Sequence, residues 1–316
     1  MASHSEPLYD INRTGSWLVC KTCGTQFPTD DKHRVTTCLI CDDPRQYVPP
    51  SGQSFVSLHA LRSGGHKNVF TPMPVDPERL IAINSQPKVA IGQRAILVRT
   101  SQGNVLWDCV TLLDRETIAK INDLGGLKAI VISHPHYYST HLEWARAFDC
   151  PVYLAAEDRE WLTQQDVGHQ VFITETETDV LATKVLKLGG HFPGSLVMLF
   201  EDRLLIADTF FATPSGLGNW DKDSLGTVRG RPRGVSSFSF MWSYPNMIPL
   251  APNALQQMWA VLKKHEFSST HGAFPGLDIV VKTPAEMKQR VLESMQIQIR
   301  FSGHGDHGML KESVSW

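Results

Sequence analysis

Short apolar runs alternate with segments of helical periodicity along most of the chain. Runs of about four to six mostly apolar residues have the length of buried β-strands, and apolar positions that recur every three or four residues indicate helices covering a sheet. Strands are expected at 80–83, 95–98, 104–107, 127–132, 152–154, 196–200, 203–206 and 267–270. Helices are expected at 114–124, 138–148, 157–162, 254–264 and 284–299.

Turn and cap residues support these boundaries. Ser101-Gln102-Gly103-Asn104 predicts a hairpin between two of the strands, and Glu201-Asp202 predicts another. Gly125-Gly126 stops the first helix, and Pro284 stands at the start of the last one. Strand pairs mixed with strand–helix alternation fit the α/β (α+β) class, with two sheets and helices outside them.

Composition narrows the class of protein. The 316 residues, 42% hydrophobic and 20% charged, match a globular protein of about two domains rather than a disordered or collagen-like chain. The net charge of -2 gives no electrostatic reason to bind nucleic acid or a membrane surface. Residues 1–7 lack the basic start and apolar core of a secretion signal, and no apolar stretch could span a bilayer. We therefore expect a cytoplasmic, reducing environment, whereas the oligomeric state is not indicated.

Four of the six cysteines form two Cys-x-x-Cys pairs. Cys20 and Cys23 are separated from Cys38 and Cys41 by fourteen residues. Each pair can present two sulfurs to one metal ion, and four thiolates complete the tetrahedron of a structural zinc site. Two disulfides or four unrelated buried thiols are the alternative, which a chain without a secretion signal disfavours. We expect one structural zinc ion here.

The cysteine pairs define a small first domain. A segment this short has too little apolar material for its own core, so a metal ion must supply much of its folding free energy. Pro49-Pro50-Ser51-Gly52 is typical of a linker. We therefore expect a zinc ribbon with its linker at 1–50 and a second domain at 51–316.

Side chains of metal-ligand type stand at the ends of four predicted strands. His134 and His136 directly follow a buried strand and are one residue apart. His191 lies in a glycine-flanked turn before a strand, and Asp208 and His271 each follow the apolar end of another. Three imidazoles with one open position make a zinc ion catalytic, because the metal lowers the pKa of its bound water to about 7. The spacing therefore predicts a catalytic metal site.

These motifs resemble the metallo-β-lactamase superfamily. The matching segments are His134-Pro135-His136, Gly189-Gly190-His191-Phe192-Pro193-Gly194-Ser195, Leu205-Ile206-Ala207-Asp208-Thr209 and Ser269-Thr270-His271-Gly272, with Asp108 closing the early hairpin. The cysteine pairs and the segment 45–52 resemble a subgroup with an N-terminal zinc ribbon, known from fungi and bacteria. The resemblance extends from residue 51 to the C-terminus. It implies an αββα sandwich with its metal site along one edge of the two sheets.

One motif departs from the pattern of the superfamily. The first motif is usually His-x-His-x-Asp-His, but here Tyr138 and Ser139 stand where the Asp and the last His would be. Those positions normally build a second metal site together with His271 and a shared Asp208. The resemblance therefore implies one firmly held zinc ion, a second that is weak or absent, and Tyr138 as a hydrogen-bond or proton donor. His141 could substitute as a ligand of the second site, although an ordinary histidine on a helix surface is the simpler interpretation.

The expected function is that of a metal-dependent hydrolase. Zinc-bound hydroxide held by His134, His136 and His191 would attack a small ester, lactone, lactam or thioester, with Asp208 completing or orienting the metal shell. Similar fungal proteins open lactam rings, so lactamase-like detoxification is one candidate role. Glyoxalase-type thioester hydrolysis is a rival that usually needs two metals. The other rival is a sandwich that has lost catalysis and binds a metal, a ligand or a partner protein.

The segment 213–252 is a long loop rich in Gly, Pro and aromatic residues, and such loops are often functional lids. Its basic cluster at 229–233 could clamp a substrate anion or stay solvated. Its aromatic side chains could wall an apolar pocket or pack the loop onto the fold. They are Trp220, Phe238, Phe240, Trp242 and Tyr244.

Overall fold

A computed structural model of the protein describes residues 9–228 and 235–314. The basic cluster at 229–233 and residues 1–7, considered above as a secretion signal, lie outside the described residues. Of the helices that are described, none is long and apolar enough to cross a membrane.

The chain folds into two compact units. Unit 1 runs to Thr174 and includes Val180–Ala182, and unit 2 comprises Glu175–Asp179 and the chain from Thr183 onward. The cysteine segment belongs to unit 1, where β1 (Leu18–Cys20) pairs antiparallel with β2 (Phe55–Ser57) beyond the expected linker. A ribbon that forms a domain of its own at 1–50 stays a prediction.

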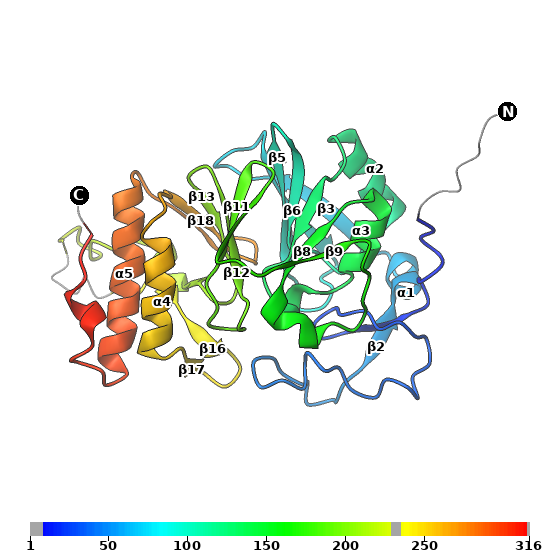
Figure 1. The fold of residues 1–316 in the computed structure, drawn as a ribbon, viewed down its shortest axis with the longest axis horizontal. Coiled ribbons are helices and arrows are strands. Elements are labelled where there is room, and N and C mark those ends of the chain that lie inside the picture. The colour runs from blue at the N-terminus through cyan, green and yellow to red at the C-terminus, as the bar shows by residue number, and fades with distance from the viewer. Residues whose placement is uncertain (1–8, 229–234, 315–316) are drawn as a thin grey trace. The chain divides into compact units, whose positions relative to one another are not determined.

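Unit 1 contains a seven-stranded sheet of order β3-β4-β5-β6-β7-β8-β9 (Figure 1). The strands from β3 to β6 pair antiparallel, and those from β6 to β9 pair parallel. They are β3 (Lys67–Pro72), β4 (Leu80–Gln86), β5 (Arg94–Thr100), β6 (Gly103–Trp107), β7 (Ala129–Val131), β8 (Val152–Ala155) and β9 (Gln170–Ile173). The strands expected from apolar runs are confirmed at β4 to β8, whereas β3 and β9 were missed.

Helices connect the parallel strands of unit 1. Parallel neighbours require a crossover, which α2 (Arg115–Asp123) provides between β6 and β7 and α3 (His141–Phe148) between β7 and β8. Asp114 caps α2 by accepting a hydrogen bond from the Thr117 N–H at 2.7 Å. Because β6 and β7 run parallel, the residues that follow them emerge at the same edge of the sheet.

Unit 2 contains a six-stranded sheet of order β10-β11-β12-β13-β18-β19. The strands are β10 (Glu177–Val180), β11 (Thr183–Lys187), β12 (Leu196–Phe200), β13 (Arg203–Leu205), β18 (Ser269–His271) and β19 (Asp278–Val280). Strand β12 runs antiparallel to β13, and β13 runs parallel to β18. The start of β12 and the ends of β13 and β18 therefore share one edge.

Two helices cover one face of this sheet. Helices α4 (Pro252–Leu262) and α5 (Pro284–Phe301) lie side by side (Figure 1) and confirm the two C-terminal helices expected from the sequence. Thr283 caps α5 by accepting a hydrogen bond from the Glu286 N–H at 3.2 Å. Buried side chains of both helices share a core with the sheet, among them Met258, Val291, Met295, Leu186, Val197 and Leu204.

Several short elements correct the sequence-based boundaries. The helix expected at 138–148 starts only at His141, because η1 (Pro135–Tyr137) is a separate 3-10 turn, and the helix expected at 157–162 is the 3-10 helix η2 (Ala156–Trp161). Strand β14, directly before the long loop, pairs with β15 inside it, and β16 pairs with β17 within the loop. The remaining short elements are α1 (Leu58–Ser63), β14 (Phe211–Ala212), η3 (Pro214–Leu217), β15 (Phe238–Ser239), β16 (Met241–Ser243), β17 (Ile248–Pro249) and η4 (Gly308–Lys311).

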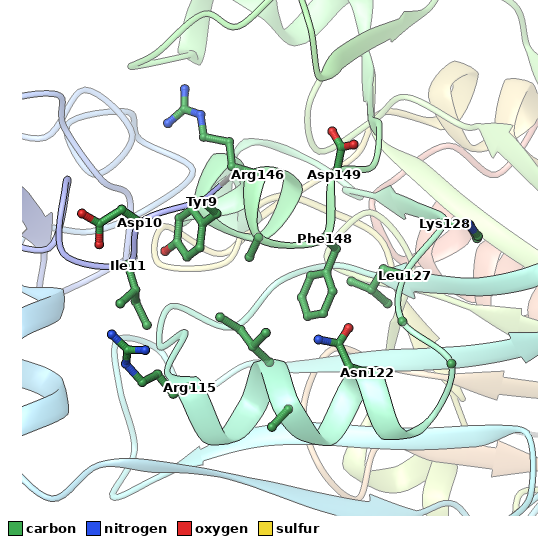
Figure 2. Close-up of a pocket in the computed structure, with 15 residues that line it drawn as sticks. Tyr9, Asp10, Ile11, Arg115, Asn122, Leu127, Lys128, Arg146, Phe148 and Asp149 are labelled. Carbon is green, nitrogen blue, oxygen red and sulfur yellow. The ribbon is translucent and has the colours of Figure 1, made fainter. Parts of the chain in front are cut away.

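The N-terminal segment packs onto α3 beside a cavity. Tyr9 donates a hydrogen bond to the buried Glu143 carboxylate at 2.6 Å, and Thr14 donates to its other oxygen. A cavity of about 770 Å³ lies between this segment, α2 and α3 (Figure 2). The predicted site residues, all of which the structure describes, do not line it, so this cavity is separate from the candidate site. Its charged lining residues are Asp10, Arg115, Lys128, Arg146 and Asp149.

Truncating a core side chain of α5 should destabilise the protein. Met295 is fully buried in the core of unit 2, so we expect Met295→Ala to lower the free energy of unfolding by about 2–5 kcal/mol in a denaturant titration. Arg300→Ala on the exposed side of the same helix is the control, with an expected change below about 0.5 kcal/mol. Equal stabilities of the two variants would contradict this packing of α5.

Candidate metal centres

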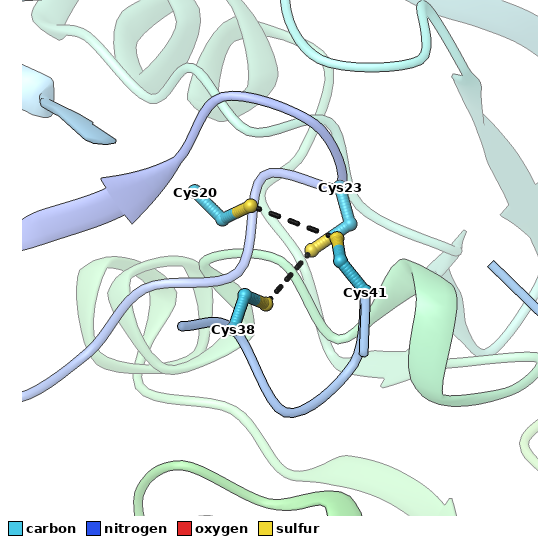
Figure 3. Close-up of side chains that lie close together, drawn as sticks. All are labelled: Cys20, Cys23, Cys38 and Cys41. Carbon is cyan, nitrogen blue, oxygen red and sulfur yellow. Dashed lines mark hydrogen bonds between the residues drawn. The ribbon is translucent and has the colours of Figure 1, made fainter. Parts of the chain in front are cut away.

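The four paired cysteines converge in unit 1. Cys20 Sγ lies 3.7 Å from Cys41 Sγ, and Cys23 Sγ lies 3.6 Å from Cys38 Sγ (Figure 3). All four sulfurs lie within 4.8 Å of one another. The four side chains are buried and carry free thiols. The arrangement favours a common metal ion over the alternative of two disulfides.

The spacing of these sulfurs fits a tetrahedral ion. Four sulfurs that each lie about 2.3 Å from a zinc ion are about 3.8 Å apart, close to the 3.6 and 3.7 Å separations in this cluster. Burial raises the pKa of the Cys23 thiol, so the apo cluster keeps this proton until a cation replaces it. Donor type, spacing and burial together fit a site whose positions are all filled by protein.

His134 and His136 lie together in unit 1. The chain leaves β7, passes through Ser133 and enters η1, so that His134 caps this turn and His136 lies within it. Their ring centroids are 5.0 Å apart, and a ligating nitrogen of one lies within 4.8 Å of a ligating nitrogen of the other. Both rings are buried. The pair can therefore offer two nitrogens to one ion.

Hydrogen bonds fix the orientation of the first of these rings. Asp108 Oδ1 accepts a hydrogen bond from the Ser133 N–H at 2.7 Å and so holds the chain just after β7. Ser133 Oγ lies 2.9 Å from His134 Nδ1, which makes Nε2 the nitrogen that can ligate a metal. Asp108 itself adopts a φ of +59°. This left-handed conformation costs a non-glycine residue roughly 1–3 kcal/mol and is concentrated at functional sites.

His191 and Asp208 form a second donor pair, in unit 2. His191 Nε2 lies 3.9 Å from Asp208 Oδ2, and both side chains are buried. Thr209 Oγ1 accepts a hydrogen bond from the His191 N–H at 3.2 Å and donates one to the Gly189 carbonyl. A Cβ on Gly190 would lie 2.7 Å from Thr209 Oγ1. The glycine-flanked turn is therefore needed for its close approach to the end of β13.

Backbone and hydroxyl groups of the long loop hold this second pair. His191 Nδ1 donates to the Trp242 carbonyl at 2.9 Å, which selects the tautomer whose Nε2 faces Asp208. The Tyr244 hydroxyl donates to the Asp208 carbonyl at 2.8 Å, and burial raises the pKa of this phenol. Sequence reasoning missed the Trp242 contact because a backbone carbonyl has no signature in residue type. Tyr244 was named only as a pocket-lining aromatic.

His271 lies outside the groups of ligand atoms that the described residues form. It ends β18 as expected, but its Nδ1 lies 2.9 Å from Asp278 Oδ1 and its Nε2 lies 3.0 Å from Ser269 Oγ. Neighbours on β18 and β19 thus engage both ring nitrogens. The structure does not bring His271 and Asp208 together as ligands of a second ion.

The two residues that replace the usual second-site ligands are engaged within unit 1. Tyr138 is buried, and its hydroxyl donates to the Asp158 carbonyl at 3.0 Å. The proton of the phenol is used in this contact, and a role of Tyr138 as a donor to substrate stays a prediction. Ser139 Oγ lies 3.0 Å from Thr111 Oγ1. Neither side chain offers what the Asp and His of the usual motif would supply.

Comparison with known proteins identifies the family. Residues 90–240 match the sequence model of the metallo-beta-lactamase superfamily. The chain belongs to this superfamily and has its mixed α/β, sheet-rich fold. It is 36% identical over 262 residues to the uncharacterized protein YmaE of Bacillus subtilis (strain 168). The aligned region covers 82% of this chain and 88% of that relative. The resemblance to the superfamily is thereby confirmed, whereas the zinc-ribbon subgroup is only suggested by the cysteine cluster.

Two of the solved structures with a similar fold have little sequence identity to this chain. The chain is 13% identical to VMB-1, with a TM-score of 0.49 over 72% of this chain and 98% of that one. It is 14% identical to the metallo-beta-lactamase FIM-1 from Pseudomonas aeruginosa, solved in its mono-zinc form, with a TM-score of 0.46 over 73% and 96% of the two chains. Identities this low carry no information on the substrate.

His141, the alternative ligand considered above, is buried and engaged on both ring nitrogens. Its Nδ1 lies 2.7 Å from the Tyr138 carbonyl, and its Nε2 lies 2.9 Å from the Gln170 side-chain amide. Burial lowers the pKa of His141 to about 4, against about 6.5 for an exposed histidine. Between these values the unfolded chain takes up a proton that the folded chain does not, so stability falls as the pH falls.

Replacing His141 should make the free energy of unfolding depend less on pH below pH 6.5. In the wild type, the loss of unfolding free energy that comes from His141 grows to roughly 3 kcal/mol between pH 6.5 and pH 4, at 1.36 kcal/mol per pKa unit. The His141→Gln variant has no imidazole to protonate and should lack this loss. Urea unfolding of wild type and variant across this range measures the difference in slope. His304→Gln, at an exposed position, is the control and should keep the wild-type slope. A wild-type slope in His141→Gln would show that His141 is not buried neutral.

Proposed function

We propose that the chain is a zinc-dependent hydrolase in which His134, His136, His191 and Asp208 share one catalytic ion. Three imidazoles and a carboxylate are ligands that suit zinc. Membership of the metallo-beta-lactamase superfamily supports the proposal, since the four residues stand in the motifs by which the chain resembles that family.

The observation that carries the proposal is the support of the histidine rings. His134 and His191 engage Nδ1 with a protein oxygen, from Ser133 and Trp242 respectively, so both can present Nε2. Two histidines that only packed in a core would not need to have the same tautomer. Metal-ligating histidines regularly use the second nitrogen in this way, because the bond fixes the ring and raises its basicity.

Each side chain then has a definite part in the chemistry. A bound zinc ion acts as a Lewis acid and makes water a nucleophile near neutral pH. His134, His136 and His191 hold the ion through neutral nitrogens, and Asp208 adds the one negative charge of the donor set. The neutral Tyr244 keeps the Asp208 backbone in place through its hydroxyl. No proton transfer is assigned to Tyr138.

The proposed substrate is a small molecule with an ester, lactone, lactam or thioester carbonyl and an apolar part. An aromatic series in unit 2 begins at the metal-ligating ring. Tyr244 lies 5.9 Å from His191 between ring centroids, Phe211 lies 5.2 Å from Tyr244, and Phe274 lies 6.2 Å from Phe211. Such rings favour a partly apolar ligand, as in lactamase-like detoxification.

A second catalytic ion is not part of the proposal. Tyr138 and Ser139 are held by protein oxygens, and His271 is engaged by Asp278 and Ser269. Two-metal thioester hydrolysis of the glyoxalase type is therefore less well supported than chemistry at one ion. A structural zinc ion at the four cysteines completes the metal content. Free thiols at this cluster also fit the proposed cytoplasmic, reducing location.

Removing one histidine should abolish both metal binding at this site and hydrolysis. We expect His191→Ala to lose about one zinc ion per chain and to lower any activity on a panel of esters, lactones, lactams and thioesters by more than about 100-fold. Even mutation of a residue that only hydrogen-bonds a metal ligand lowers metal affinity or activity about 10–100-fold. Elemental analysis and turnover measure the two effects. His304→Ala is the matched control and should keep both.

The outcomes distinguish the rival functions. Retained activity in His191→Ala would rule out hydrolysis at this ion. Wild-type protein that binds the ion but turns over nothing on the panel would favour a metal-dependent binding protein.

The cysteine cluster has its own test. Wild-type protein should carry about two zinc ions per chain, and Cys23→Ser should lose about one of them because a stable structural site needs four protein ligands. Cys150→Ala, which removes a thiol outside the cluster, is the control and should keep both ions. A Cys20–Cys23 disulfide under reducing conditions would contradict the zinc assignment.

A further inference from the structure

The first cysteine pair lies against the loop that carries the histidine pair. The Gln26 N–H donates to the Ser139 carbonyl at 3.1 Å, and the Ser139 hydroxyl lies within 3.4 Å of the Gly24 carbonyl. Gly24 directly follows Cys23, and Ser139 is the third residue after His136. A short path of backbone and hydrogen bonds therefore leads from the cysteine cluster to the histidine loop.

The approach of the two segments is close enough to require glycine. Gly24 has a φ of +86°, and a Cβ built on it would lie 2.0 Å from Thr111 Oγ1 and 3.2 Å from Ser139 Oγ. Thr111 is part of the same contact, because its Oγ1 lies 3.0 Å from Ser139 Oγ and its carbonyl accepts a hydrogen bond from Thr140 Oγ1 at 2.9 Å. Gly24 thus lies against Thr111, which holds Ser139 and Thr140 through hydrogen bonds.

Ser139 is the point at which this contact affects the backbone. It adopts a φ of +42°, in the left-handed region that non-glycine residues rarely occupy. The residue links η1, which holds His136, to α3. Its conformation therefore decides the direction in which the chain leaves the histidine turn. The hydrogen bond from Gln26 holds the Ser139 carbonyl in that conformation.

Gln26 is anchored from the other side as well. Its carbonyl accepts a hydrogen bond from Thr163 Oγ1 at 2.6 Å, and its side-chain amide donates to the Thr14 carbonyl at 3.3 Å. A segment fixed at both its cysteine end and its Gln26 end can hold the loop it contacts.

We propose that the first cysteine pair and the residues directly after it, Cys20–Gln26, position the His134–His136 pair for metal binding, acting through Ser139. Gly24 and Ser139 are positioning residues in this arrangement and touch neither ion. The inference rests on the proposed function, because it presumes that the histidines bind a metal. It gives the cysteine cluster a role in the zinc affinity of the histidine centre, in addition to holding its own segment together.

The test compares two glycine variants of the full chain. Gly24→Ala forces a left-handed alanine and a collision with Thr111, whereas Gly52→Ala, at a φ of +82° with nothing within 4 Å of the new Cβ, carries the conformational cost alone. Zinc competition with a chelator, with elemental analysis of the chain, gives the affinity of the histidine centre. We expect zinc to bind the histidine centre about 10–100-fold more weakly in Gly24→Ala, as it does when residues that support metal ligands are mutated. In Gly52→Ala the affinity should change by no more than about twofold.

Two further measurements separate positioning from a general loss of stability. Hydrogen exchange of residues 134–141 should be faster in Gly24→Ala than in Gly52→Ala once their unfolding free energies have been measured and matched by denaturant. Ser139→Ala removes the hydroxyl contacts without changing a residue of the cysteine segment, and should also weaken the histidine centre while the cysteine centre keeps its zinc. If Gly24→Ala does not fold, Ser139→Ala decides by the same criterion.

The outcomes of the two proposals differ. Wild-type affinity at the histidine centre in both Gly24→Ala and Ser139→Ala would overturn the positioning role and leave the hydrolase proposal standing. Equal losses in Gly24→Ala and Gly52→Ala would also overturn it, because the specific contact with Thr111 would then be irrelevant. A wild-type chain whose histidines bind no zinc would defeat the hydrolase proposal itself.

Discussion

Strand pairing determines which side chains can meet at each donor pair. In unit 2, β12 runs antiparallel to β13 and β13 runs parallel to β18, so the turn before β12 and the chain after β13 open on the same edge. His191 and Asp208 meet there although sixteen residues lie between them in the sequence. In unit 1 the parallel pairing of β6 with β7 places Asp108 beside Ser133. The sheets thus bring together the residues of each donor pair.

Orientation of the imidazoles is the second constraint, and the protein meets it with a side-chain hydroxyl and a main-chain carbonyl. A histidine ligates through one nitrogen at a time, and the partner of the other nitrogen selects which one. Ser133 and the Trp242 carbonyl supply such partners. The loop of the first pair contains a left-handed residue at Ser139, and Asp108, which holds that loop from the end of β6, is a second one. Each such conformation costs roughly 1–3 kcal/mol. That cost persists only because neighbouring hydrogen bonds over-determine the loop.

The sequence predicted the parts of this structure that depend on residue type. Continuous apolar runs revealed β5, β7 and β12, and spacing at strand ends revealed both donor pairs. Strand β3, Lys-Asn-Val-Phe-Thr-Pro, escaped because a half-exposed strand needs no apolar run. The carbonyl of Trp242 escaped because every residue has one. The state of His271 depends on Asp278 in β19, a three-residue strand that was not expected, so its partner could not be anticipated.

The two proposed centres differ in how much of the surrounding chain each one needs. The four cysteines lie between Cys20 and Cys41, so their site closes within one short segment that packs on a small cluster including Val19 and Leu112. The histidine centre instead needs a loop whose backbone is held in a left-handed turn by Gln26. A metal that orders the cysteine segment therefore supplies a contact on which the histidine loop depends.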